Sequence, residues 1–141
     1  MILPDVNILI YAFRPDSKDH ERYKSWLDDV VNGPGAFGVA PQALASMVRI
    51  CTHRGVFAEP DSLGDVLAFC RALLELPNAT VIFPGERHWP IFESLCESGK
   101  ARGNLVQDAW FAALAMEHGC EWVTTDGDYA RFSGLRWRRP F

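Results

Sequence analysis

The chain has 141 residues, 48% of them apolar and 23% charged, and its formal net charge is −4. These proportions are typical of one globular domain, expected to span residues 1–141 and to bury a core without disulfides or metal staples. No apolar run reaches the ~20 residues of a membrane span, and the N-terminus lacks the basic flank of a signal peptide. The four cysteines form no CxxC pair, which argues against a zinc site and is typical of reduced thiols in the cytoplasm.

The first half of the chain alternates short β-like runs with longer helical ones. Apolar residues at helical spacing predict the helices. Arg14-Pro15 and Asn32-Gly33-Pro34 are stop signals for the first two of them. The predicted elements, in chain order, are a strand at 2–4, helices at 6–13 and 20–31, a strand at 36–40, and helices at 41–53 and 62–76.

The second half continues the same alternation. Its first run, ATVIF, has the β-branched and aromatic character of a strand. Asn104 is expected to cap a long helix, and Gln107 three residues later resembles the partner in a capping box. The predicted elements are a strand at 79–83, helices at 86–98 and 104–118, and strands at 121–125 and 135–137.

Strands separated by helices predict an α/β fold. We expect parallel βαβ units in a mostly parallel sheet of four to five strands, flanked by helices on both faces. In such sheets the ligand site lies outside the carboxyl ends of the strands.

The residues expected at that edge are largely acidic. Asp5 ends the first strand, Asp126 and Asp128 follow the 121–125 strand, and Asp108 is expected in the first turn of the helix that leads into it. Several carboxylates at one point repel each other unless a cation lies between them, and oxygen ligands alone favour Mg²⁺ or Mn²⁺. Each acid also has a structural interpretation: Asp5 as a helix N-cap, Asp108 as a helix-terminus charge, and Asp-Gly as a turn.

Three blocks of the sequence, PDVNIL at 4–9, NLVQDAWFAALAMEHG at 104–119 and TTDGDYARFSGL at 124–135, resemble the signature blocks of the PIN domain, and within it those of VapC toxins. The resemblance implies a three-layer PIN-like fold and a metal-dependent endoribonuclease acting on single-stranded or loop RNA. Its acidic positions surround one or two Mg²⁺ ions. By this match Asp5 takes the first position, Asp108 the third, and Asp126 with Asp128 the fourth, with support from Asn7 and Thr124.

The second acidic position of the family departs from the pattern. The family commonly has a Glu three residues before an Arg, and counting back from Arg49 gives Ser46. No Asp or Glu occurs between Asp29 and Glu59, so no neighbour replaces the missing charge. The alternative to an active nuclease is therefore a catalytically weak or inactive PIN-like binding module.

Basic and aromatic residues near the C-terminus suggest an RNA-binding surface on this acidic protein. Eleven of the 14 basic residues are arginine, the better bidentate phosphate ligand. The alternatives are a charged edge strand and, for the aromatic rings, core packing. The candidates for RNA contact near the C-terminus are Arg136, Arg138 and Arg139, with Tyr129, Phe132 and Trp137, and Arg49 is a further candidate from the first half of the chain.

The VapC resemblance also implies partners. We expect a homodimer and a VapB-like antitoxin that inserts a cation near the acidic pocket. The aromatic residues assigned to these contacts are Trp26, Phe57, Phe69, Trp89 and Trp110, and the alternative for each of them is core packing.

Overall fold

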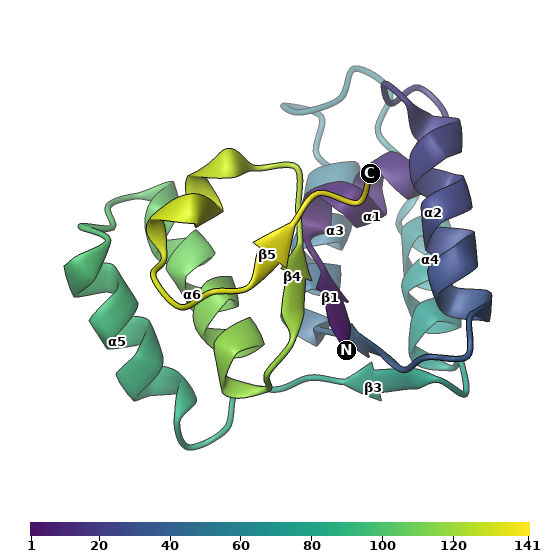
Figure 1. Ribbon diagram of the computed structural model, residues 1–141. Helices are drawn as coiled ribbons and strands as arrows, with labels where there is room; N and C mark the ends of the chain where they lie inside the picture. The colour runs from purple at the N-terminus through teal and green to yellow at the C-terminus, as the bar shows by residue number, and fades with distance from the viewer.

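The computed structural model describes residues 1–141 and contains five short strands, six α-helices and one 3-10 helix (Figure 1). The strands are β1 (Ile2–Pro4), β2 (Phe37–Val39), β3 (Ala79–Val81), β4 (Glu121–Val123) and β5 (Trp137–Arg138). The helices are α1 (Val6–Phe13), α2 (His20–Asn32), α3 (Pro41–Cys51), α4 (Leu63–Leu74), α5 (His88–Ser98), α6 (Asn104–Glu117) and the 3-10 helix η1 (Gly127–Arg131).

The five strands form one parallel sheet in the order β3-β2-β1-β4-β5. The chain builds outward from β1 through β2 to β3, then crosses to the other side of β1 to add β4 and β5. Ile2 of the central strand is therefore in register with both Phe37 and Glu121. The strand order reverses between β1 and β4, and α/β folds bind ligands at such a point.

Two groups of helices cover the sheet, as the predicted α/β architecture requires. Helices α1 to α4 pack against one another, and α5 packs against α6. Figure 1 shows α5 and α6 together on one side of the sheet and α2 and α4 on the other. Helix α6 is rich in small residues, which let its backbone lie close to its neighbours. Its fully buried alanines are Ala109, Ala112, Ala113 and Ala115.

The core between β4, α6 and η1 is aromatic. Trp122 of β4 is fully buried, and its ring stacks on Phe111 of α6 with centroids 5.4 Å apart. Tyr129 of η1 packs on the other side of the cluster, 5.4 Å from Trp122. Such contacts stabilise beyond the area that they bury, so they fix α6 and η1 relative to β4.

The start of α6 differs from the prediction. Gly103, not Asn104, is the N-cap residue, and its φ of 57° lies in the left-handed region that glycine adopts without strain. Asn104 is the first helical residue and makes no cap hydrogen bond, so the predicted capping box with Gln107 is wrong. We predicted Asp108 in the first turn of this helix, but it lies beyond that turn.

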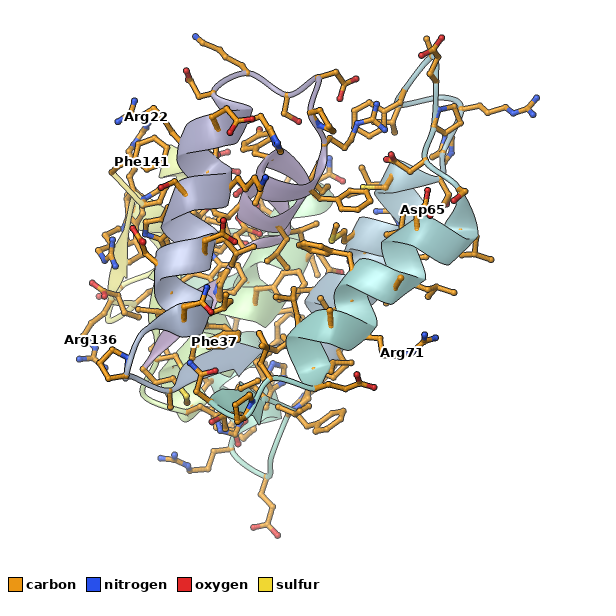
Figure 2. The ribbon with its side chains drawn as sticks, turned by 90° about the vertical axis from the view of Figure 1, so that its right-hand side faces the viewer. Arg22, Phe37, Asp65, Arg71, Arg136 and Phe141 are labelled. Carbon is orange, nitrogen blue, oxygen red and sulfur yellow. The ribbon has the colours of Figure 1, made fainter.

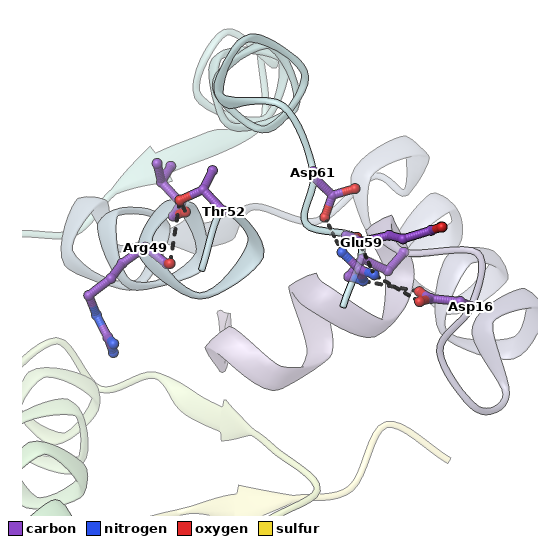
Figure 3. A network of polar contacts seen from close by, with 7 residues as sticks. Asp16, Arg49, Thr52, Glu59 and Asp61 are labelled. Atoms are coloured by element: carbon purple, nitrogen blue, oxygen red, sulfur yellow. Dashed lines mark hydrogen bonds and ion pairs between the residues drawn. The ribbon is translucent and has the colours of Figure 1, made fainter. Parts of the chain in front are cut away.

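Two clusters of side chains join segments that are far apart in the sequence. The buried Arg14 guanidinium pairs with Asp61 at 2.6 Å and Asp16 at 2.8 Å and donates to the Glu59 carbonyl, and Figure 3 shows these three partners gathered round one point. The cluster joins the end of α1 to the loop after α3. At the C-terminus Phe141 lies under the Arg22 guanidinium of α2, as Figure 2 shows.

No helix is long and apolar enough to span a bilayer.

Candidate active site

The site forms at the carboxyl ends of the two central strands. Pro4 of β1 is in register with Val123 of β4, so the residues that follow, Asp5 and Thr124, lie side by side. The Asp5 amide continues the ladder by donating to the Val123 carbonyl at 2.9 Å. The sequence predicted that Asp5 follows the first strand, and the structure places it at the carboxyl end of β1.

Thr124 is fully buried and organises the polar groups around it. Its hydroxyl donates to Asp5 Oδ2 at 2.5 Å. The Thr124 hydroxyl oxygen also accepts hydrogen bonds, from Asn7 Nδ2 at 3.2 Å and from the Asp126 amide at 3.0 Å. One hydroxyl thus connects three of the predicted site residues.

Asp5 also has the structural role that the sequence left open. Its Oδ1 accepts from the Val6 amide at 2.6 Å, and Asp5 is the N-cap of α1. The N-cap interpretation is confirmed. Protein donors therefore satisfy this buried carboxylate in part, and its remaining acceptor capacity faces the cavity in front of it.

Three of the four predicted acids line one cavity of about 240 Å³. Asp5, Asp108 and Asp126 reach it from β1, α6 and the segment after β4. Ser46 and Arg49 of α3 line the same cavity, which places the departure from the family pattern beside the carboxylates. The other lining residues are Val6, Asn7, Ile10, Ile50, Gln107, Phe111 and Tyr129.

Burial and neighbouring carboxylates raise the pKa of Asp5 and of Asp108. Burial is the main cause that raises the pKa of Asp5 to about 6, and the negative charges of Asp108 and Asp126 add to it against the opposing Thr124 and Val6 hydrogen bonds. The pKa of Asp108 is also raised, first by burial and then by Asp126. These shifts mean that bringing the charges together costs free energy, which a cation in the cavity would offset.

Tyr129 contributes a hydrogen-bond donor to the site. Its hydroxyl donates to Asp108 Oδ1 at 3.4 Å. Burial and the three neighbouring carboxylates raise its pKa far above the usual range, so it remains a neutral phenol. The ring is 2% exposed, so the prediction that it stacks on RNA bases is wrong; Phe132 is equally buried and packs in the core, the alternative that the sequence left open.

No three His, Cys, Asp or Glu side chains, as placed, lie close enough together to hold a metal ion. Asp126 instead caps η1 by accepting from the Asp128 amide at 2.8 Å. The donor set nevertheless suits one class of ion, because the acidic groups around the cavity are all carboxylates and Mg²⁺ and Mn²⁺ prefer oxygen.

The remaining predicted residues lie outside the cavity. Asp128 is exposed on η1. Arg136 donates to the Gly119 carbonyl at the opposite end of β4, and Arg138 pairs with Glu121 at 3.2 Å. Arg139 is exposed in the C-terminal segment. The structure thus brings together Asp5, Asn7, Ser46, Arg49, Asp108, Thr124 and Asp126.

Sequence reasoning missed Gln107 as a site residue. It was assigned to a capping box, yet its side chain lines the cavity beside Asp108. Its spacing could have indicated this position, because Gln107 and Phe111 are four residues apart and therefore lie on one face of α6, the face that lines the cavity.

Comparison with known proteins identifies the family of this chain. The family model described as PIN domain matches residues 2–135. Ribonuclease VapC43 of Mycobacterium tuberculosis is 41% identical over 140 residues, covering 99% of this chain and 95% of that protein, and ribonuclease VapC25 of the same organism is 36% identical with 99% of each covered.

Solved structures of low sequence identity share the fold. VapBC2 from Rickettsia felis, bound to a DNA fragment from its promoter, superposes with a TM-score of 0.70 at 17% identity, covering 99% of this chain and 98% of that chain. VapC20 of Mycobacterium tuberculosis, a toxin that cleaves the sarcin-ricin loop, gives 0.67 at 14% identity, with 96% of each covered.

Proposed function

This chain belongs to the PIN-domain family, and on that premise we propose that it is an endoribonuclease that hydrolyses phosphodiester bonds in single-stranded or loop RNA. One observation carries the proposal: Asp5, Asp108 and Asp126 line a single cavity at the point where the strand order of the sheet reverses. Its curated relatives are named as VapC ribonucleases over the whole length of this chain.

The same carboxylates would hold a divalent cation, Mg²⁺ or Mn²⁺. Asp5, Asp108 and Asp126 are the ligands that the donor chemistry favours, and their mutual repulsion is relieved when a cation lies between them. Such an ion, when bound, stabilises the charge that develops on a phosphate undergoing hydrolysis.

The surrounding residues position these groups. Thr124 fixes the orientation of Asp5, and Asn7 in turn fixes Thr124. Tyr129 holds Asp108 from the other side. Arg49 is the cationic side chain that lines the cavity, where it can bind a phosphate oxygen of the RNA. Binding, orientation and charge are thus divided among separate residues.

The proposed biological role is the toxin of a toxin–antitoxin pair, with a VapB-like antitoxin as partner. The structural neighbours include toxin–antitoxin complexes. A homodimer stays a prediction. Of the five aromatic residues that we assigned to partner contacts, only Trp89 is more than half exposed, at 58%. Phe83, six residues earlier in the chain, is 60% exposed. Sedimentation at about 100 μM, with and without the co-encoded small protein, tests both associations.

The deciding experiment is incubation of the purified protein with a mixed RNA pool in Mg²⁺, in Mn²⁺ or in EDTA, followed by mapping of the cut ends. We expect cuts that need the ion and that Asp5→Asn abolishes. Asp28→Asn, which removes an exposed carboxylate on α2, is the matched control and should cut normally.

The competing proposal is a PIN-like module that binds RNA or antitoxin without cleaving. Ser46 favours it, because this hydroxyl lines the cavity where the family commonly supplies a carboxylate. RNA binding without any ion-dependent cut would support this second function and refute the first.

A further inference from the structure

A second cavity adjoins the carboxylate cavity between α3 and the start of α6. It has a volume of about 380 Å³ and is lined by Gln42, Ala45, Ser46, Arg49, Asn104 and Gln107. Ser46, Arg49 and Gln107 also line the carboxylate cavity, so the two spaces share one wall.

The two cavities differ in chemistry. The carboxylate cavity contains three acids, whereas the second contains none. Three side-chain amides, from Gln42, Asn104 and Gln107, line the second cavity. An amide presents a donor and an acceptor side by side, which matches the edge of a nucleobase in unpaired RNA.

Arg49 stands at the junction of the two cavities. It is exposed and takes part in none of the ion pairs of the structure. Figure 3 shows its side chain extending from α3 away from the cluster of Asp16, Glu59 and Asp61. Because position 46 is a serine, no carboxylate one helical turn away neutralises this guanidinium.

We propose that the second cavity is a base-recognition subsite. It would hold the base of the nucleotide next to the scissile phosphate, with Arg49 on the phosphate between the two cavities. This inference rests on the proposed ribonuclease function. Charge decides which part of the nucleotide lies where. The acids repel a phosphate and Arg49 attracts it, while an uncharged base fits the amide-lined space.

Two variants test the subsite without touching the carboxylates. Gln42→Ala/Asn104→Ala removes amides that line only the second cavity, and Ala45→Leu fills it while leaving every amide in place. All three positions lie at the ends or on accessible faces of helices, and circular dichroism verifies folding. The probes are fluorescein-labelled rA5, rC5, rG5 and rU5, measured by anisotropy in EDTA so that binding is read independently of cleavage.

We expect the wild-type protein to prefer one homopolymer on the order of tenfold, the discrimination that one well-placed amide contact gives. Both variants should bind all four about equally. Arg49→Ala should weaken every probe and lower the slope of log affinity against log salt by about 0.7, the value for one phosphate on a single strand. Arg71→Ala on α4, whose side chain points into solvent in Figure 2, is the control and should change neither.

The outcomes separate this inference from the function on which it rests. Base preference in EDTA that both variants abolish supports the subsite, even if no cleavage is found with Mg²⁺ or Mn²⁺. Ion-dependent cleavage with a base preference that neither variant alters overturns the subsite and leaves the ribonuclease standing. Equal binding of all four probes by the wild-type protein also overturns it.

Discussion

The Thr124 hydroxyl donates to Asp5 Oδ2 at 2.5 Å, joining residues 119 positions apart in the chain. This contact couples the carboxyl ends of β1 and β4, and both residues are almost wholly removed from solvent. A hydrogen bond to a buried carboxylate stabilises its charged form. The pKa of Asp5 is nevertheless raised, because burial outweighs this bond. In the absence of a cation, the ionised form of Asp5 is therefore unfavourable in free energy.

The first prediction concerns the pH dependence of stability. Asp5 has a pKa of about 6 in the folded protein against an ordinary value of 3.8 for an aspartate, so folding takes up a proton between about pH 4 and pH 6. The free energy of unfolding should then fall as pH rises through this window. Two pKa units correspond to about 3 kcal/mol. Thermal melts of metal-free protein from pH 4 to pH 8 measure it.

Asp5→Asn should flatten that pH profile and raise the free energy of unfolding at pH 7 by about 1 kcal/mol. The gain is smaller than the full titration effect, because an amide cannot accept both the Thr124 and Val6 hydrogen bonds. Asp28→Asn should leave the profile unchanged. An Asp5→Asn profile that matches the wild type would show that Asp5 titrates normally.

The second prediction concerns ion binding. At ~10 mM Mg²⁺ or Mn²⁺, an ion with a millimolar Kd should raise the free energy of unfolding by about 1.4 kcal/mol. Asp5→Asn should lose this gain, since it removes one of the three carboxylates of the cavity. Melting curves with and without each ion measure the effect. If neither ion shifts the wild-type midpoint, the metal proposal fails.

The third prediction concerns Ser46. Ser46→Glu should restore a fourth carboxylate to the cavity and tighten ion binding, by on the order of 1–3 kcal/mol for a charge within about 4–6 Å of the ion. The measurement is the ion concentration at the midpoint of the melting titration. Ser25→Glu, on the exposed face of α2, adds the same charge elsewhere and controls for net charge. Weaker ion binding in folded Ser46→Glu would show that position 46 does not face the ion.

The fourth prediction concerns Thr124. Thr124→Val keeps the shape of the side chain but leaves Asp5 Oδ2 without its donor and the Asp126 amide without its acceptor. We expect a loss of about 2–3 kcal/mol in the free energy of unfolding. Thr124→Ser, which keeps the hydroxyl, should lose only about 1 kcal/mol for the missing methyl group. Equal losses in both variants would assign the role of Thr124 to packing.

The sequence by itself determined the alternation of strands and helices, since apolar periodicity and Gly-Pro stops are local signals. It therefore predicted the parallel sheet and the edge at which Asp5, Asp108 and Asp126 meet. It did not predict the start of α6, because Gly103 takes a left-handed conformation that depends on how the chain turns after α5.

Only the tertiary structure decided which neighbours act together. Asp126 and Asp128 are equivalent in sequence, but the tight turn of η1 directs one into the cavity and leaves the other in solvent. Tyr129 is an aromatic residue in a polar segment, and burial against Trp122 makes it a donor to Asp108. The cavity shared by Arg49 and Gln107 joins α3 to α6. Contacts between elements so far apart depend on packing, which no local pattern of residues encodes.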